Sequence, residues 1–297
     1  MTKLIALYFY IEARYNNEWK YYSERFSNNN RPEFTDEELI TVYLFSIMEE
    51  RRFRIKDIYE FAKKYLLSWF PKLPSYQAFN NRLNRMAAVF QKMLEEVLML
   101  QVLSGQYSPC NVVDSLPIIT CSGKRKSKVA KEISEKGYCS TKSMYYYGLK
   151  IHANAMVQEG TMPLPERLVI TSAAENDLNV FRNNWYDMVN KTFMGDKIYN
   201  DEPWFEALFK ENNSRMFIPV KAVKGMPERI KQFNKAADDL WSKAVSAVRQ
   251  PIESLFNWLI EKTDIQRASK VRSTKGLLVH VYGKLASAFL SVIIFKP

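Results

Sequence analysis

Three carboxylates lie in hydrophobic surroundings at widely separated places in the chain. Asp114 lies inside the apolar run 112–118, Asp196 follows Phe193-Met194-Gly195, and Glu253 lies in the apolar stretch 251–256. An ionised carboxylate in such surroundings is costly unless a cation or hydrogen bonds compensate it. Carboxylate sites favour hard ions such as Mg²⁺ or Mn²⁺, and a pair of such ions can promote phosphoryl transfer on a nucleic-acid backbone. We therefore consider the three as candidate ligands of a two-metal site.

Each carboxylate also has a purely structural interpretation. Asp114 could be a hydrogen-bonded strand residue, and Asp196 could cap the turn after its strand, with Asp201 as a nearby rival for its role. Glu253 near a helix start could simply complement the helix dipole. Residue types and spacing alone leave these alternatives open.

Composition limits the class of protein. The chain has 297 residues, 47% of them hydrophobic and 14% aromatic, which excludes a disordered chain. Its net charge of +11 favours an anionic partner, with nucleic acid first and an anionic membrane second; a merely soluble basic protein is the alternative. Three cysteines without paired spacing indicate a reducing compartment and no zinc site, and only two histidines are present.

Two apolar stretches could suggest a membrane. The stretch 4–11 is followed by Glu12 and Arg14 without a cleavage site, so we predict a helix there and no signal peptide. The stretch 285–295 is too short to span a bilayer. We expect no membrane partner and a cytoplasmic location.

Residues 1–105 are predicted to form an all-helical domain. Thr35 and Glu38 form a capping-box pattern at one helix start, a second helix is expected over 55–69, and a third begins after Ser75 and continues over 89–103. The third helix has a polar face rich in amide and arginine side chains, which are the types that read base edges in a major groove. These residues are Gln77, Asn80, Asn81, Arg82, Asn84 and Arg85. The pattern favours a helix-turn-helix-like DNA-binding unit, and an ordinary solvated helix face is the alternative.

Residues 106–297 show an α/β pattern with a mixed sheet. We expect strands over 111–121, 144–156, 168–173, 192–195 and 216–220, helices over 176–191, 204–211 and 251–261, and a last amphipathic helix from 277. The basic stretch 221–241 is interpreted as an insertion or loop. The loop 122–142 contains Lys124, Arg125 and Lys126, which suit a phosphate backbone, although a solvated loop is the alternative.

The second domain resembles the DDE transposases of bacterial insertion sequences, most closely the insertion sequence 982 family. The resemblance covers roughly residues 105–295 and is weaker over the helical N-terminal part. Its motifs are Val-Asp-Ser-Leu-Pro-Ile at 113–118, Tyr-Gly-Leu-Lys-Ile-His at 147–152, Gly-Asp-Lys-Ile-Tyr at 195–199, the helix 248–259 and the tail 268–277. The first four motifs in the right order are specific, whereas one alone is weak, and the tail adds to them.

The resemblance implies a ribonuclease-H-like catalytic domain in which Asp114, Asp196 and Glu253 are the catalytic, metal-binding triad for two Mg²⁺ ions, with Mn²⁺ able to substitute. Arg249 keeps the Arg-three-Glu part of a Tyr-two-Arg-three-Glu-six-Lys signature and is expected to bind phosphate. Ser246 and Ile260 replace the Tyr and Lys of that signature, so those two roles are not assigned. Lys150 and His152 match the family's second strand and are given a supporting role.

The sequence therefore predicts a DNA transposase that binds the inverted repeats of its element and cuts and joins DNA with Mg²⁺. Its partners would be double-stranded DNA at the transposon ends and the target, and the holding of two ends implies a dimer on DNA. A stand-alone metal-dependent nuclease on the same fold and a non-cutting, transposase-derived DNA-binding protein are the alternatives. A nucleoid-associated bacterial protein is expected.

Overall fold

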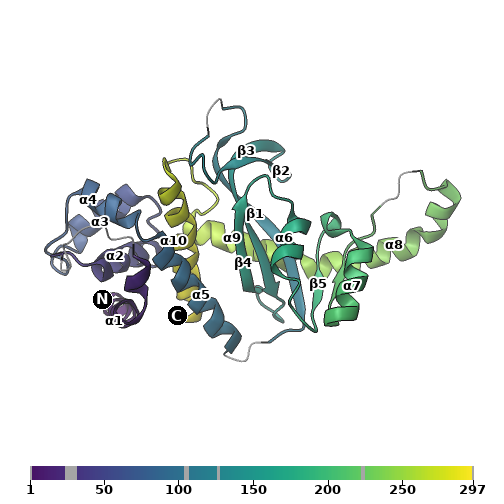
Figure 1. Ribbon diagram of the computed structural model, residues 1–297, viewed down its shortest axis with the longest axis horizontal. Helices are drawn as coiled ribbons and strands as arrows, with labels where there is room; N and C mark the ends of the chain where they lie inside the picture. The colour runs from purple at the N-terminus through teal and green to yellow at the C-terminus, as the bar shows by residue number, and fades with distance from the viewer. Residues whose placement is uncertain (1, 24–31, 104–106, 126–127, 222–224, 296–297) are drawn as a thin grey trace.

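The computed structural model describes residues 2–23, 32–103, 107–125, 128–221 and 225–295. Its N-terminal part, up to residue 103, is helical wherever the described residues have regular structure (Figure 1). The elements are α1 (Thr2–Asn17), the 3₁₀-helix η1 (Trp19–Tyr22), α2 (Asp36–Met48), α3 (Ile55–Tyr65), α4 (Tyr76–Leu83) and α5 (Ala87–Leu103).

Local sequence signals explain how two of these helices begin. Thr35 Oγ1 accepts a hydrogen bond from the Glu38 N–H at 3.2 Å, and Glu38 accepts one from the Thr35 N–H at 2.7 Å, so the predicted capping box is confirmed. Ser75 caps α4, as predicted. The single helix expected over 75–103 is wrong, because i→i+3 bonds from Arg85 and Met86 form a tight turn that separates α4 from α5.

The described residues of the second part form a six-stranded mixed sheet. Its path is β2-β3-β1-β5-β6, with β4 also paired to β3. The pairs β1–β5 and β5–β6 are parallel, and the pairs that involve β3 are antiparallel. The strands are β1 (Cys110–Ser122), β2 (Glu135–Cys139), β3 (Met144–Met156), β4 (Leu164–Ser172), β5 (Thr192–Met194) and β6 (Arg215–Phe217). The predicted α/β class with a mixed sheet is confirmed, and the curled sheet is consistent with a ribonuclease-H-like domain.

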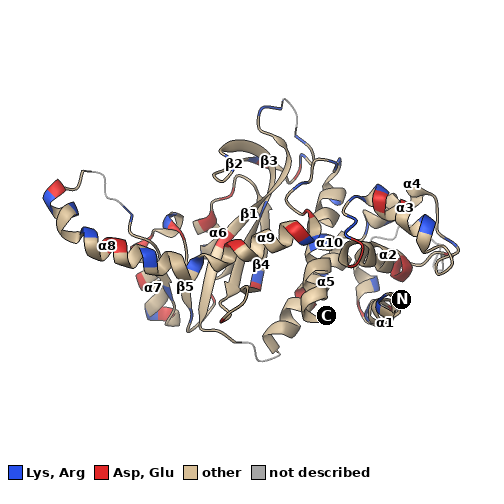
Figure 2. Ribbon diagram, turned by 180° about the vertical axis from the view of Figure 1, so that it is seen from behind, with Lys and Arg blue, Asp and Glu red and all other residues tan. Residues whose placement is uncertain are grey.

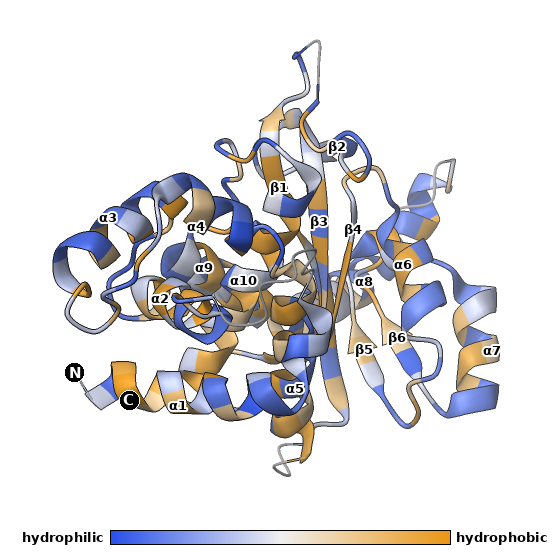
Figure 3. Cartoon of the chain, turned by 60° about the vertical axis from the view of Figure 1, so that its left-hand side comes forward, coloured by the Kyte–Doolittle hydropathy of each residue, from blue (hydrophilic) through white to orange (hydrophobic). Residues whose placement is uncertain are grey.

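Helices cover both faces of this sheet, as Figure 1 shows with α6 in front and α9 behind. The helices of this part are α6 (Asp177–Asn184), the 3₁₀-helix η2 (Lys197–Tyr199), α7 (Glu202–Asn212), α8 (Glu228–Arg249), α9 (Pro251–Thr263) and α10 (Thr274–Ile293). In Figure 3 the hydrophobic residues gather on the strands and on the helix sides turned toward them. Alternation along β1 produces this arrangement: Val112 and Leu116 join the core with α9 and α10, whereas Val113 joins the core with α6 and α7.

Three sequence interpretations need correction here. Most of the stretch 221–241, interpreted as a loop or insertion, belongs to α8, in which apolar residues recur every three or four positions. Strand β2 lies inside the stretch 122–142 that was interpreted as a loop. Helix α6 ends at Asn184 and not at 191, because the chain turns there toward β5.

The C-terminal helix α10 packs mainly on α5 and α2, so one hydrophobic core runs from the N-terminal helices into the sheet. Gly283 allows the close approach, because a Cβ there would lie 2.7 Å from the ring of Tyr43. Among the described residues, α10 is the one helix long and apolar enough to cross a membrane by length and composition, and 61% of that apolar window is buried inside the protein. Such burial is typical of a core helix.

Lys284 on α10 provides a test of this packing. Its side chain is buried, its Nζ donates to the Asp264 carbonyl at 3.1 Å, and burial lowers its pKa to about 7. Between that value and the ordinary pKa of 10.5 the unfolded chain binds the proton and the folded chain does not, so this group makes the protein more stable as pH rises. We expect Lys284→Met to raise the free energy of unfolding by about 1–4 kcal/mol at pH 6 and by much less at pH 10.

Urea unfolding at a series of pH values measures this difference. Lys270→Met, on an exposed neighbouring segment, is the control and should leave the pH dependence unchanged. A gain from Lys284→Met that stayed constant from pH 6 to 10 would contradict the assignment.

Candidate active site

Asp114 lies on β1, and Asp196 lies two residues beyond the end of the neighbouring parallel strand β5. In the β1–β5 ladder Val112 pairs with Met194, and each carboxylate follows its strand position by two residues. The paired register ends at Met194, and Asp196 lies at the start of η2, near the same end of the sheet as Asp114. Their proximity also appears in the electrostatics, since the charge of Asp196 contributes to raising the pKa of Asp114.

Asp114 is held by two donors. The Ser115 N–H donates to its Oδ1 at 2.8 Å, and Arg249 Nη1 donates to its Oδ2 at 2.8 Å. Burial raises the pKa of Asp114 to about 6, against the opposing effects of the Ser115 hydrogen bond and the Arg249 charge. The structure thus provides the cation and hydrogen bonds that an aspartate in this apolar strand requires.

Asp196 and its rival Asp201 have different surroundings. Asp196 is half-buried and accepts the Ile198 N–H at 2.8 Å, as the cap of η2. Asp201 caps α7 and forms an ion pair with Arg182, so both of its oxygens are engaged within the protein. Asp196, and not Asp201, is therefore the carboxylate near Asp114. Asp196 also caps η2, so its structural interpretation is correct as well.

Arg249 and Glu253 lie at the junction of α8 and α9. Gln250 between the two helices has helical backbone angles, so the chain continues as one long helix with a division at Pro251, which lacks an N–H. Residues four apart share a side of a helix, which places Glu253 one turn beyond the guanidinium that contacts Asp114. Glu253 is exposed, as the first-turn acid of α9.

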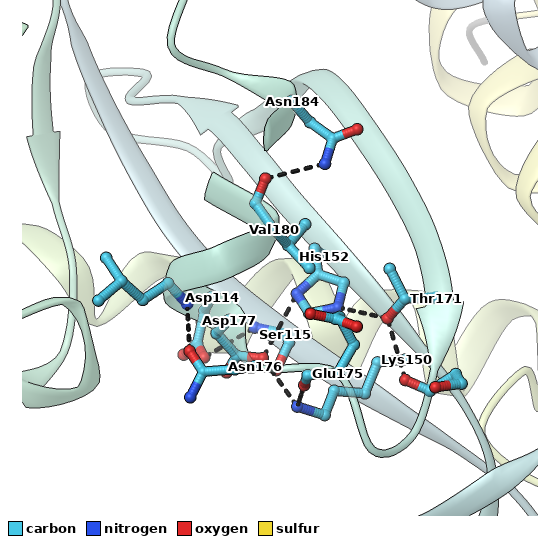
Figure 4. Close-up of polar contacts among 12 residues, drawn as sticks. Asp114, Ser115, Lys150, His152, Thr171, Glu175, Asn176, Asp177, Val180 and Asn184 are labelled. Atoms are coloured by element: carbon cyan, nitrogen blue, oxygen red, sulfur yellow. Dashed lines mark hydrogen bonds and ion pairs between the residues drawn. The ribbon is translucent and has the colours of Figure 1, made fainter. Parts of the chain in front are cut away.

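Asp177, which the sequence interpretation did not include, lies at the centre of a polar cluster beside Asp114 (Figure 4). It accepts from Ser115 Oγ at 3.1 Å and from Lys150 Nζ at 2.8 Å, and its Oδ1 lies 3.4 Å from His152 Nδ1. Lys150 also donates to the Glu175 carbonyl at 2.7 Å. Lys150 and His152, predicted as supporting residues, are thus gathered around Asp177. Asp177 is the first residue of α6, and an acidic residue there is typical of any helix start, so the sequence gives no sign of its role in this cluster.

The charges in this cluster are those of Asp177 and Lys150. Burial, with a smaller contribution from the Lys150 charge, lowers the pKa of His152 to about 4, so the imidazole is neutral near pH 7. His152 Nε2 lies 2.8 Å from Thr171 Oγ1 across the β3–β4 ladder. The cluster ties β1, β3, β4 and α6 together directly behind Asp114.

Comparison with known protein families identifies the family of this chain. A family described as "Transposase DDE domain" matches residues 108–290, which is more than half of the chain and includes Asp114, Asp196 and Glu253. The chain belongs to the DDE transposase family. No curated protein and no solved structure matches it.

DDE transposases are enzymes that generally use divalent metal ions. In the described part of this transposase, no group of three or more His, Cys, Asp or Glu side chains is arranged to hold a metal ion. Asp114 and Asp196 suit a hard cation by their chemistry and their adjacent positions, while Arg249 now occupies one oxygen of Asp114. A metal would therefore exchange with the guanidinium at that oxygen.

The predicted DNA-binding residues of the transposase lie on other elements. On α4, Gln77 and Asn81 are exposed and Asn80 is half-buried, while Asn84 and Arg85 follow the end of the helix and are half-buried. Arg82 donates to the Phe34 carbonyl and to Asp36, both at 2.5 Å, so its guanidinium is engaged within the helical part. Lys124 and Arg125 are exposed at the end of β1, and Lys126 lies outside the described residues.

Proposed function

We propose that this enzyme is the DNA transposase of a bacterial insertion sequence, most similar to the insertion sequence 982 family. It binds the inverted repeats of its element, hydrolyses a DNA strand at each end and joins the freed 3′-hydroxyl to target DNA. The observation that carries the proposal is the nearness of Asp114 on β1 to Asp196 just beyond β5, with Arg249 bonded to Asp114 and Glu253 one helical turn further on. Such an enzyme works on DNA in the cytosol, in association with the nucleoid.

In this proposal Asp114, Asp196 and Glu253 hold two Mg²⁺ ions, and Mn²⁺ can substitute for them. The bound ions supply the activation of a water or 3′-hydroxyl and the neutralisation of charge on the phosphoryl group. Asp114 binds a cation in its ionised form, which prevails above its pKa of about 6. Arg249, whose Nε is buried without a hydrogen-bond partner among the described residues, provides a charged donor for the phosphate backbone.

Strand joining separates this function from its alternatives. Purified protein is incubated with Mg²⁺, DNA carrying the ends of the element and a plasmid target, with pre-cut ends in a parallel reaction. A transposase yields joined products from both. A nuclease of the same fold yields cleavage without joining, and a DNA-binding protein that no longer cuts yields neither. Inverted repeats flanking the gene supply the end sequence for this assay.

End recognition is assigned to α4, whose exposed Gln77 and Asn81 lie one turn apart on one side of the helix. Alanine at either position is expected to weaken binding to the element's end by about 1–3 kcal/mol and to leave binding to unrelated DNA unchanged. Fluorescence anisotropy with both DNAs measures the difference. Alanine at Lys124 and Arg125 is the contrasting variant, since loss of phosphate contacts weakens binding to all sequences and reduces its salt dependence. Equal weakening on both DNAs by Asn81→Ala would contradict base reading by α4.

Two DNA ends have to be held together during strand transfer, so the working form is a dimer on DNA. Light scattering of the protein mixed with end DNA tests the stoichiometry. Two protein chains per pair of ends is the expected result.

A further inference from the structure

Helix α8 extends away from the rest of the molecule, as Figures 1 and 2 show from opposite sides. It is attached through its C-terminal half: Trp241 Nε1 donates to the Ile218 carbonyl at 2.9 Å, and Ser242 Oγ accepts the Val220 N–H at 3.0 Å. All 22 residues of the helix are described, and Val245 is the one that is fully buried. The N-terminal half therefore has two long sides open to solvent.

One of those sides carries a regular hydrophobic stripe. Apolar residues recur along it at alternating intervals of three and four, which is the a/d heptad pattern of a coiled coil. The α8 stripe consists of Ile230, Phe233, Ala237, Leu240, Ala244 and Ala247, and every one of these residues is exposed. Phe233 is 88% exposed and Leu240 72%. Scattered exposed apolar residues are common, but a continuous stripe on a projecting helix marks a contact surface.

The chemistry of the stripe identifies its partner as another helix. Its six positions contain no charged or polar side chain, so it offers nothing to a DNA backbone. The side of α8 that faces the protein body, with Trp241 and Val245, is a different one. An a/d seam is filled by the a/d seam of a facing helix.

We propose that the α8 stripe pairs with the α8 stripe of a second copy of this chain, in antiparallel orientation. In the register that aligns a with d positions, each layer combines one large residue and one alanine. The layers are Ile230 with Ala247, Phe233 with Ala244, and Ala237 with Leu240 of the second copy, and each occurs twice by symmetry. A parallel pair would instead stack Phe233 on Phe233 and Ala244 on Ala244, which leaves some layers overfilled and others empty.

The charges beside the stripe fit the same orientation. Two cations border the stripe on one side, Arg229 and Lys243. In the antiparallel register Arg229 faces Gln250 of the second copy and Lys243 faces Ala236, so no cation meets a cation. Opposed helix dipoles also favour antiparallel pairing.

The size of the stripe sets the strength of this contact. From Ile230 to Ala247 the helix rises about 26 Å, so two helices about 10 Å wide make a contact smaller than a standard protein interface. We expect a weak dimer in free solution that becomes stable when two copies bind the paired DNA ends. This part rests on the proposed function. The tip of each helix then reaches Ala247 of the other copy, two residues before Arg249.

Sedimentation velocity of the full chain over a range of concentrations, with and without end DNA, tests the surface. The variant Phe233→Glu/Leu240→Glu should stay monomeric where the native chain dimerises, and glutamate at these exposed helical positions should not unfold the protein. Gln232→Glu/Ser246→Glu adds the same charge on α8 outside the stripe and should dimerise like the native chain. Dimerisation of all three proteins, or a native chain that stays monomeric even on paired ends, would overturn the proposal.

Cross-linking tests the orientation. Ala237→Cys and Leu240→Cys are introduced into separate copies of different size. In the antiparallel register a mixture of the two forms a disulfide faster than either variant alone, whereas preferential linking of each variant to itself would overturn the antiparallel arrangement. The cross-linking and the sedimentation without DNA concern the free protein, so they remain interpretable if strand joining fails. A dimer that passes both tests but joins no DNA would count against the proposed function and not against this surface.

Discussion

Replacing Asp114 by Asn is expected to abolish DNA strand cleavage by this transposase while leaving DNA binding intact. Asparagine has nearly the same shape and can still accept the Ser115 N–H bond, but it lacks the charge that a divalent cation requires. Loss of one ligand of a two-metal centre removes several kcal/mol of transition-state stabilisation, which corresponds to roughly 10³-fold or more in rate. Single-turnover cleavage of labelled end DNA measures the rate, and anisotropy on the same DNA measures binding.

The same substitution at Asp196 and at Asp201 tests which of these two residues is the second metal ligand. Asp196→Asn should behave like Asp114→Asn, because the two carboxylates lie near each other at the same end of β1 and β5. Asp201→Asn is the control, since asparagine keeps the cap of α7 and Asp201 is already paired with Arg182. If Asp201→Asn abolished cleavage and Asp196→Asn did not, the second ligand would be Asp201. Cleavage at the native rate by Asp114→Asn would remove the basis of the proposed centre.

The strands of the sheet could be expected from the sequence because the relevant signals are local, whereas the approach of Asp114 and Asp196 was expected only from the family resemblance. Alternation of apolar residues along 144–156 predicted a strand with Leu149 and Ile151 on one face and Lys150 and His152 on the other, and the structure has this arrangement. A short apolar run that ends at a carboxylate, as at Asp196, predicted a strand followed by a turn. Such signals involve residues that are close together in the chain, so they can be recognised from the sequence alone.

Other features depend on residues that are distant in the sequence. Asp177 has the local pattern of a helix start, and its contacts with Ser115 and Lys150 arise only when α6 packs on the sheet. The packing of α10 on α5 and α2 likewise joins the two ends of the chain into one core. Helix α8 differs from the local pattern for another reason. Its apolar stripe faces solvent, and a basic stretch that contains Met and Pro and buries little is typical of a loop.

Asp177 is expected to be one of the most sensitive positions for stability in the sheet. Its side chain is 12% exposed and that of its partner Lys150 15%, with 2.8 Å between the charged atoms. Removing one partner of a buried ion pair leaves the other charge uncompensated, so Asp177→Asn should lower the free energy of unfolding by about 3 kcal/mol. Lys150→Met alone should also destabilise the protein, because it leaves the Asp177 charge without its cation.

The double variant distinguishes a coupled pair from two independent contacts. With both charges removed, Asp177→Asn/Lys150→Met should lose less stability than the sum of the single variants, by about 1–3 kcal/mol. Ser115→Ala is the matched control: it removes the Oγ bond to Asp177 but keeps the N–H that holds Asp114, and should cost only about 1 kcal/mol. Urea unfolding of the native protein and the four variants measures these losses of stability. Additive losses would mean that Asp177 and Lys150 stabilise the sheet separately, and Asp177 would then have no ionic role behind Asp114.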